Sequence, residues 1–508
     1  MRFDGSFGSV KQRTRLLESG GSGPIERSSE RTYFSNLAVW ITNAERSWPV
    51  FAGATALLVY WLTLAPGLTW ANFGGDGAEL ITASATLGIP HPPGYPAYIL
   101  IGNLISLVPI GTVAYRFNFI SAFWLAMSTG FLTATVSTLL VRGQNRKRVV
   151  PLVPISVGLV FAFLPLVWGQ ALITEVYSLN LVLISALVWL LVQESNSKKS
   201  YLAGAIFGLS LTTHLTSILV LPLSLYLLPK KQWPRFALGA LIGIIPIFIL
   251  PILGSSSSPV IWGRPNTLSG WIWLVTTQIY RPNLFALDAQ GFWARGTEWF
   301  SDGLWQVLLI GVPLIVIGII DAAVRNRRLI AALLATTSLY ALYAFGYRTN
   351  DAIVFLLPGI LFFSVSLGFG MKKLGNASLL LPVILLALNF GSQNLRDDLA
   401  VRDSAEREMQ SLPKNAIVIT PGDQTATTLL YFQYVEGLRP DLVVVDDTMF
   451  QFDWYRDRLS TLHFSLVHLG IDDVPGFVKE NLNARAVCHV SLVSSPGSSC
   501  MFPTDKDL

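Results

Sequence analysis

The 508-residue chain has little charge. Asp, Glu, Lys and Arg make up 13% of its residues, about half of the roughly 25% found in soluble globular domains. Hydrophobic residues make up 52%, and the mean hydropathy is +0.52. This balance excludes an ordinary soluble domain and indicates an integral membrane protein. The net charge of +5 lies in short basic clusters between apolar segments, which argues against a nucleic-acid-binding surface.

Cysteine is nearly absent as well. The two cysteines, Cys488 and Cys500, lie close to the C-terminus, and neither has partners at the spacing of a zinc site. A zinc site is therefore not expected. The two thiols are expected to form one disulfide if this end of the chain faces an oxidising compartment, and to stay free otherwise.

The chain also lacks the apolar core of a secretory signal peptide. Residues 1–46 are polar and rich in Ser, Gly and Arg. This composition predicts a disordered tail.

Long hydrophobic runs dominate the next part of the chain, 47–391. A helix needs about 20 apolar residues to cross a bilayer. Eleven segments qualify, two of them short, and the short pair within 201–229 has the alternative of one broken or re-entrant hairpin. The predicted spans are 49–67, 116–141, 149–167, 178–193, 201–213, 215–229, 236–254, 303–323, 329–346, 352–371 and 376–391.

Basic residues mark one side of this predicted bundle. With eleven spans, every basic cluster falls on the same side, which the positive-inside rule assigns to the cytoplasm. The N-terminus is then cytoplasmic and residues 392–508 lie outside. The clusters are Arg27/Arg31/Arg46, Arg142/Arg146/Lys147/Arg148, Lys198/Lys199, Lys230/Lys231/Arg235, Arg325/Arg327/Arg328 and Lys372/Lys373.

Residues 392–508 change in character. The stretch "AIVITPGDQTATTLLYFQYVEGLRPDLVVVDD" has a β-branched apolar run, a run with helical period and a second apolar run, which predicts strand, helix, strand. The predicted fold is thus a mainly α polytopic helix bundle (47–391) followed by a small α/β domain on the outer side.

Polar residues gather in the loops on that outer side. The first loop, "FGGDGAELITASATLGIPHPPGYP" (73–96), contains no Lys or Arg. Ionisable residues at membrane depth are candidates for function, and several at one end of a bundle predict a site. The candidates are Asp76, Glu79, His91, Tyr95, Glu175, His214, Arg264, Arg281, Arg348 and Asp351.

Each candidate also has a structural interpretation. Asp76 after two glycines is placed to cap a helix, and Glu79 three residues on completes a capping-box pattern. For Glu79 we favour this structural role. "HPPGYP" is compatible with a rigid turn, His214 with a hydrogen-bonded core histidine, and Arg281 with a snorkelling interfacial side chain.

The run "GGDGAELITASATLGIPHPPGYPAYILIGNLISLVPIGTVAYRFNFIS" resembles the signature region of the bacterial and eukaryotic multi-pass proteins related to transmembrane protein O-mannosyltransferase, which have the C-type glycosyltransferase fold. The resemblance continues through "TEVYSLN", "GLSLTTHLTS", "IYRP" and "GDQTATTLLYFQYVEGLRPDLVVVD", and so covers most of residues 50–455. Family members commonly read Asp-Ser-Gly-Glu at the acid, whereas this chain reads "DGAE". The Asp and the downstream Glu are retained.

This resemblance implies a polyprenyl-phosphate sugar as donor and an essential acid in the first outer loop, at Asp76. We expect Asp76 to act as general base in an inverting transfer to a hydroxyl of a protein or a cell-surface glycan. The resemblance implies mannose as the sugar. Arg281, with Arg348 second, is expected to hold the lipid phosphate. The other candidates bind or orient the substrates. The family generally dispenses with a metal, so a divalent ion between Asp76 and Glu175 is not expected.

Two other classes of function compete with this hypothesis. A transporter or flippase predicts charges deep within the spans and two repeated halves, whereas the ionisable residues here lie at span ends. A sensor with an outer binding domain gives no reason for the acidic first loop.

Overall fold

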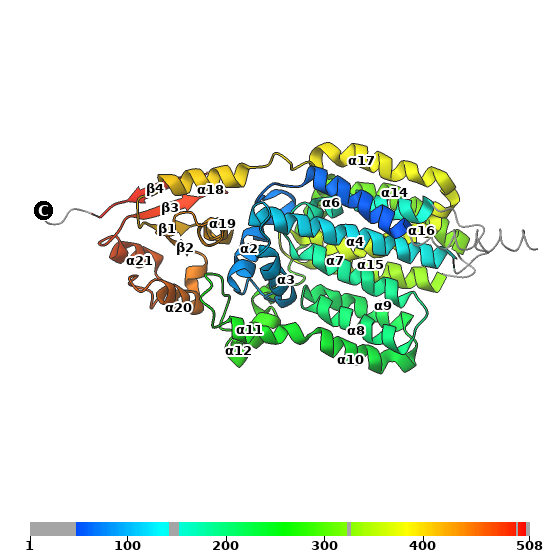
Figure 1. Cartoon of the computed structure of the whole chain (residues 1–508), viewed down its shortest axis with the longest axis horizontal. Coiled ribbons are helices and arrows are strands. Elements are labelled where there is room, and N and C mark those ends of the chain that lie inside the picture. Colours follow the sequence, from blue (N-terminus) through cyan, green and yellow to red (C-terminus); the bar gives the residue numbers. More distant parts are fainter. Residues whose placement is uncertain (1–46, 142–151, 323–326, 494–495, 504–508) are drawn as a thin grey trace, which may run out of the picture. The chain divides into compact units, whose positions relative to one another are not determined.

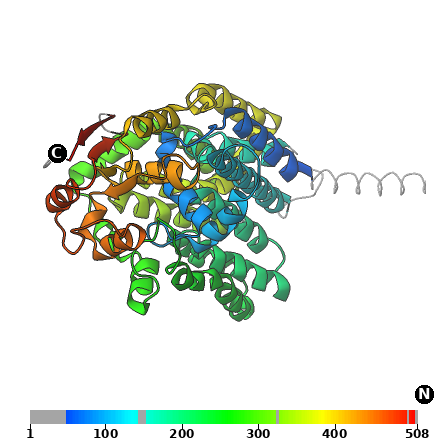
Figure 2. The same ribbon diagram turned by 60° about the vertical axis from the view of Figure 1, so that its left-hand side comes forward.

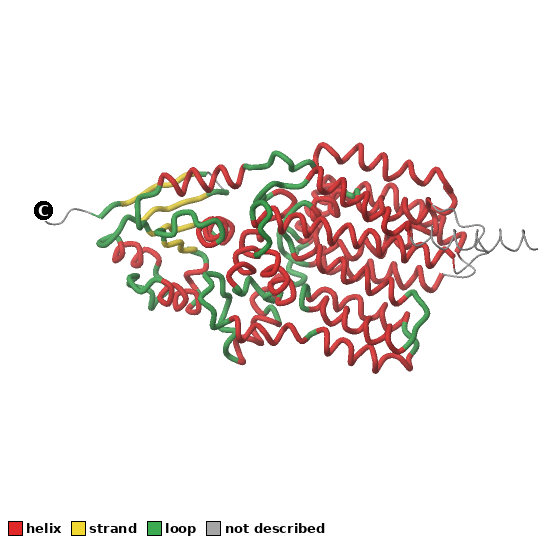
Figure 3. The backbone as a smooth tube through the Cα atoms, viewed as in Figure 1, coloured by secondary structure: helices red, strands yellow, loops and turns green. Residues whose placement is uncertain are grey.

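The computed structural model describes residues 47–141, 152–322, 327–493 and 496–503, and Trp48–Leu508 belongs to one compact unit. Apolar helices form a bundle, and a small sheet with its own helices follows (Figure 1 and Figure 3). The predicted tail (1–46), the basic clusters before residue 47 and at 142–148, and Arg325 lie outside the described residues.

The helices before the small sheet are joined by turns and loops of different lengths. They are Ser47–Thr63, α2 (Gly77–Thr86), α3 (Pro96–Ser106), α4 (Val113–Val141), α5 (Leu152–Ala162), α6 (Pro165–Ala171), α7 (Val176–Leu191), α8 (Ser197–Leu211), α9 (Leu221–Leu227), α10 (Trp233–Gly243), α11 (Leu250–Leu253), α12 (Leu268–Val275), α13 (Ala289–Trp299), α14 (Trp305–Ala322), α15 (Arg327–Gly346), α16 (Leu357–Met371) and α17 (Leu380–Gln393). The tighter or irregular turns used below are η1 (Ala71–Asp76), η3 (Leu215–Val220), η6 (Gln278–Asn283), η7 (Phe300–Leu304) and η8 (Ala352–Leu356).

Each of the eleven predicted spans overlaps a helix, but the helices are less regular than the prediction. Within the described residues, five helices are long and apolar enough to cross a membrane, or six if the bent pair α5–α6 is one span. That pair bends by 72° within the predicted span 149–167. One candidate, Ala352–Gln393, contains two predicted spans and is interrupted at Gly375 (φ 55°). The number of crossings therefore stays a prediction.

The described basic clusters lie at one end of the bundle. Figure 1 shows the connections from α7 to α8, from α9 to α10 and from α16 to α17 at the end away from the small sheet. Lys198/Lys199, Lys230/Lys231 and Lys372/Lys373 fall in or beside those connections. The sidedness used to orient the chain is therefore present in the fold, while the orientation itself remains a prediction.

Small residues let α8 and α10 approach closely. A Cβ on Gly204 would lie 2.0 Å from the carbonyl oxygen of Phe236, and a Cβ on Gly243 would lie 2.0 Å from that of Ala205. Such contacts between backbones are the usual means of packing helices in lipid, where burial of apolar side chains gives no driving force.

The C-terminal domain is a four-stranded sheet in the order β2-β1-β3-β4. The strands are β1 (Ile417–Thr420), β2 (Val443–Asp446), β3 (Val487–Ser491) and β4 (Gly497–Met501), and the helices are α18 (Ala400–Ser411), α19 (Asp423–Tyr434), α20 (Asp453–Leu462) and α21 (Val474–Asn481). Strands β1, β2 and β3 are parallel, and β4 is antiparallel to β3. The predicted strand, helix and strand are confirmed as β1, α19 and β2.

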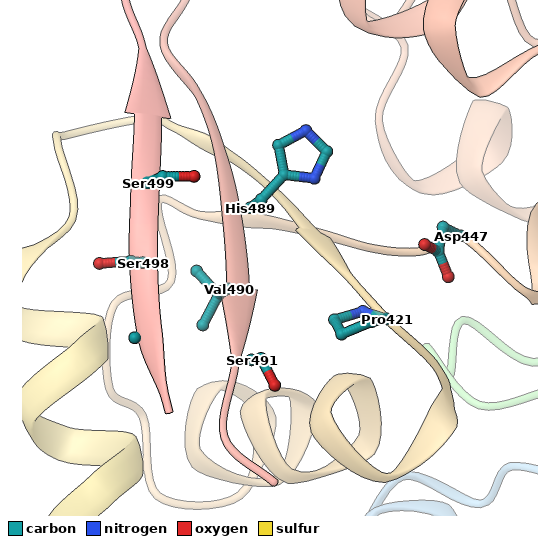
Figure 4. A pocket seen from close by; sticks show the side chains of 8 residues that line it. Pro421, Asp447, His489, Val490, Ser491, Ser498 and Ser499 are labelled. Atoms are coloured by element: carbon teal, nitrogen blue, oxygen red, sulfur yellow. The ribbon is translucent and has the colours of Figure 1, made fainter. Parts of the chain in front are cut away.

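Cys488 and Cys500 form a disulfide that joins directly opposite positions of β3 and β4. The sequence left this pairing open, and the structure decides it. Beside these strands lies a cavity of about 420 Å³. Figure 4 shows Asp447, His489 and Pro421 around it.

The C-terminal domain packs on the first loop of the bundle. Helix α19 lies beside α2 in both views (Figure 1 and Figure 2), and one apolar core includes Leu80 of α2 and Leu429 of α19. Arg264 forms ion pairs with Asp453 and Asp457 of α20. This docking brings the N-terminal end of α19 to the candidate acid.

Candidate active site

The first loop turns sharply before Asp76. Asn72 and Phe73 have left-handed backbone angles (φ 53° and 69°), which cost free energy in residues other than glycine. Gly77 then packs against the chain before α7, because a Cβ there would lie 3.2 Å from the carbonyl oxygen of Thr174. The "GGDG" sequence thus allows Asp76 to lie beside the segment that carries Glu175.

The capping interpretation of this loop is wrong. Asp76 occupies the N-cap position of α2, but its backbone is helical (φ −83°, ψ −8°) and its side chain makes no capping hydrogen bond. An N-cap side chain normally bonds from an extended backbone. Glu79 does not reach back to Asp76 as a capping box requires, because both of its oxygens bond elsewhere.

Glu79 instead holds His91. One carboxylate oxygen accepts hydrogen bonds from the His91 backbone N–H (3.2 Å) and the Trp262 indole N–H (2.5 Å). The other lies 2.5 Å from His91 Nδ1. Glu79 is 4% exposed, so its charge depends on these partners. Removing one partner of a buried ion pair costs about 3–5 kcal/mol, so Glu79 and His91 stay together. Glu79 therefore fixes the orientation of the His91 ring.

The other ring nitrogen of His91 faces the candidate base. Nε2 lies 2.9 Å from the Tyr95 hydroxyl and 3.6 Å from an Asp76 carboxylate oxygen. The structure therefore brings together Asp76, Glu79, His91 and Tyr95, four of the residues selected from the sequence.

Burial and charge set the protonation states here. Desolvation by the surrounding protein raises the pKa of Asp76 to about 6, and the positive charge of His91 opposes part of this rise. Burial alone would lower the pKa of His91, but the charges of Glu79 and Asp76 outweigh it and raise that pKa to about 10. The Asp76 side chain is still 48% exposed, so a substrate can reach it. At neutral pH Asp76 is an ionised, accessible base beside an imidazolium.

Glu175 and Asp351 lie around this centre. Burial, followed by the charges of Asp76 and Asp351, raises the pKa of Glu175 well above its ordinary value. The Glu175 carboxyl thus holds its proton more tightly than an exposed glutamate does. Asp351 accepts a hydrogen bond from the Thr349 hydroxyl at 2.6 Å.

His214 is placed as a core histidine. Its Nδ1 lies 2.7 Å from the Thr216 hydroxyl, and its ring packs against Tyr95, Tyr177 and Phe355. Burial lowers its pKa to about 4, so the ring is neutral. The His214 ring stacks on the Tyr95 ring and so helps to fix its position.

Arg281 and Arg348 come from segments that the fold joins. The Arg348 backbone N–H donates to the Asn283 carbonyl (2.8 Å), and Leu284 and Tyr347 form an isolated β-bridge. Both arginine side chains are exposed, and in the described part of the chain neither forms an ion pair with an acidic side chain. Arg264, in contrast, is engaged by two aspartates of α20.

Two features of the site were not found from the sequence. Arg295 of α13 donates to a set of carbonyls that fixes the loop carrying Arg348: those of Ala344, Phe345, Tyr347 and Thr349. Asp423 at the start of α19 acts electrostatically on Asp76 and Glu79. Its neighbour Gln424 would lie 3.6 Å from a Cβ on Gly75. The "GDQ" motif was the available signal for Asp423.

A metal ligand set is not evident in the described ranges. No group of three or more His, Cys, Asp or Glu side chains is arranged there to hold an ion.

Comparisons with known proteins agree with this architecture. The family model described as "Protein O-mannosyl-transferase TMEM260 N-terminal domain" matches residues 76–235, and "TMEM260-associated domain 2" matches residues 401–464. The first match begins at Asp76, and the second covers the segment containing Asp423.

Two relatives extend over most of the chain. Protein O-mannosyl-transferase TMEM260 of Mus musculus is 29% identical over 490 residues, which are 84% of this chain and 66% of the relative. The Dictyostelium discoideum protein of the same name is 22% identical over 520 residues, which are 85% of this chain and 62% of the relative. The chain thus spans slightly less than two thirds of the length of these curated relatives.

A solved structure shows the fold. The crystal structure of ArnT from Cupriavidus metallidurans bound to undecaprenyl phosphate matches with a TM-score of 0.57 and 13% identity, covering 87% of this chain and 92% of that chain. Taken together, the two family models and the relatives show that this chain is similar to the TMEM260-related proteins over most of its length, and the match to ArnT shows that it has the same fold as that protein.

Proposed function

We propose that the protein is a membrane glycosyltransferase that moves a sugar, mannose, from a polyprenyl phosphate to a hydroxyl of a protein or glycan acceptor on the outer side of the membrane. The observation that carries this proposal is the accessible Asp76 carboxylate, 3.6 Å from His91 Nε2 in a desolvated first loop. The names of the relatives support the reaction type, and the lipid bound to ArnT supports a polyprenyl-phosphate donor. The disulfide supports an outer C-terminal domain.

The proposed reaction is a single displacement. Asp76 accepts the proton of the acceptor hydroxyl as its oxygen bonds to the anomeric carbon. The bond from that carbon to the phosphate oxygen breaks, and its electron pair leaves with the lipid phosphate. The configuration at the anomeric carbon is inverted. His91, held by Glu79, keeps Asp76 ionised until the hydroxyl arrives, and no metal or organic cofactor takes part.

Arg281 and Arg348 are proposed to bind the departing phosphate. Two exposed guanidinium groups on joined segments provide several donors for phosphate oxygens. The C-terminal domain is proposed to position the acceptor, with Asp423 accepting a hydrogen bond from it close to Asp76.

The activity itself is tested with purified protein, labelled polyprenyl-phosphate mannose and a mixture of protein and glycan acceptors. Label in the acceptor and release of lipid phosphate support the transferase. Movement of the lipid across vesicles without release of phosphate supports a flippase instead.

Asp76→Asn tests the base. Asn keeps the shape of the side chain but does not accept the proton, and loss of a general base costs about 10²–10⁴ in rate. We expect this loss in kcat, with thermal unfolding and donor-lipid binding unchanged. A folded variant with near wild-type transfer would reassign the base to Glu175 or Asp351.

Arg281→Lys tests the phosphate site. The charge remains but the two-pronged guanidinium is lost, so we expect kcat/KM for the donor to fall by about 10-fold. Arg235→Lys is the control and should have no effect, because this half-buried arginine donates to the Lys231 carbonyl and has no proposed role in transfer. Unchanged kinetics in Arg281→Ala would move the role to Arg348.

Asp423→Asn tests the contribution of the C-terminal domain. The amide oxygen that replaces the carboxylate still accepts a hydrogen bond but carries no charge, and charged hydrogen bonds are about twice as strong as neutral ones, so we expect the acceptor KM to rise by about 10-fold while the donor KM is unchanged. Asp472→Asn, an exposed aspartate of the same domain, is the control. An unchanged acceptor KM in Asp423→Asn would show that this domain does not position the acceptor through Asp423.

A further inference from the structure

A cavity of about 450 Å³ lies beside η1, the turn that ends at Asp76. Its walls come from η1, α6, η7, η8 and α17, and the lining used below consists of Trp70, Asn72, Phe73, Gln170, Asp302 and Gln393. The volume lies within the range of roughly 300–1,000 Å³ typical of ligand sites. None of the residues assigned above to base, phosphate or acceptor binding lines this cavity.

Three polar atoms on the cavity wall have no hydrogen-bond partner. They are Asn72 Nδ2, Gln170 Oε1 and Gln393 Oε1. Gln170 is 1% exposed and Gln393 is 7% exposed, and Gln170 Nε2 already donates to the Asn72 carbonyl at 2.7 Å. Buried polar atoms are rarely left unbonded. Three of them around one cavity indicate an occupant that both donates and accepts hydrogen bonds.

The walls are also irregular in several places at once. Helices α5 and α6 meet at a 72° bend, η7 is a π-helical turn with Gly303 at φ 110°, and Asn72 and Phe73 are left-handed. Breaks in helices at membrane depth are tolerated where they line a cavity, and π-helical turns often occur at functional sites. The local geometry is therefore that of a built site.

The lining determines the chemistry of the occupant. No Lys, Arg or His is among the lining residues, so a phosphate group has no cation here. Amide donors and acceptors and the Asp302 carboxylate suit hydroxyl groups, and Trp70 and Phe73 provide aromatic surfaces for the apolar face of a ring.

We propose that this cavity binds a neutral, hydroxylated sugar ring. The inference rests on the proposed function, because it adds a sugar subsite next to the same base: Asn72 and Phe73 belong to η1, which ends at Asp76. The ring is either the donor sugar or a sugar of the acceptor, and the test separates these two sources.

The experiment measures binding without transfer, by calorimetry in detergent, for undecaprenyl phosphate, undecaprenyl-phosphate mannose and methyl α-mannoside. Gln393→Met removes one acceptor at similar volume, and Leu166→Trp fills the cavity. Ser392→Ala is the control, because this exposed serine bonds only to Asn389 of its own helix in the described contacts. Thermal unfolding verifies the fold of each variant.

We expect Gln393→Met to weaken binding of a mannose-bearing ligand by about 10-fold, in line with one lost hydrogen bond, and to leave undecaprenyl phosphate unaffected. Weaker binding of the lipid-linked mannose assigns the cavity to the donor. Weaker binding of methyl α-mannoside alone assigns it to the acceptor.

The proposal is overturned if Gln393→Met binds all three ligands as the wild type does, which means that the cavity holds water only. It is also overturned if the wild type binds undecaprenyl-phosphate mannose no more tightly than undecaprenyl phosphate and does not bind methyl α-mannoside. Leu166→Trp is supporting evidence, so its failure to fold leaves the Gln393→Met result decisive. If the wild-type protein has no transfer activity, the proposed function is refuted. If the same protein binds sugar and Gln393→Met weakens that binding, the sugar subsite is still supported.

Discussion

The site depends on one ion pair that is almost removed from water. Glu79 is 4% exposed and is bound by His91 and Trp262. A carboxylate in this position is stable only while its partners remain, because an unpaired buried charge costs several kcal/mol. His91 is thereby held as an imidazolium with its second nitrogen toward Asp76. The rigid "HPPGYP" segment and the Tyr95 hydroxyl then keep the ring in place.

The fold supports this pair from several elements distant in sequence. Trp262 lies 183 residues after Glu79, in the segment that also anchors the C-terminal domain through Arg264. The absence of a side chain at Gly77 lets the loop pack closely against the chain at Thr174, and α19 packs on α2. The C-terminal domain thus lies against the candidate site, where its Asp423 adds negative charge near Asp76.

Sequence patterns predicted much of this arrangement, and the failures have physical causes. Hydrophobic periodicity located the helices, and β-branched runs located β1 and β2, because both signals are local. The D-x-x-E spacing of Asp76 and Glu79 fits a capping box as well as two separate roles, and only the positions of His91 and Trp262 decide between them. Asp423 was missed because it reaches the first loop through docking of a separate domain. The span count was uncertain because a helix bent by 72° has the same composition as a straight one.

The central claim is that Asp76, with a pKa raised by burial, is the base. A base works when deprotonated, so kcat/KM for transfer should rise with pH through about 6 and level off above it. The direct test is the pH dependence of kcat/KM for the wild-type protein between pH 4.5 and 7.5 in detergent, with donor-lipid binding followed in parallel to separate chemistry from binding. The account predicts this acid limb in kcat/KM with donor binding unchanged around pH 6. A flat profile across that range would contradict the assignment of Asp76 as the base.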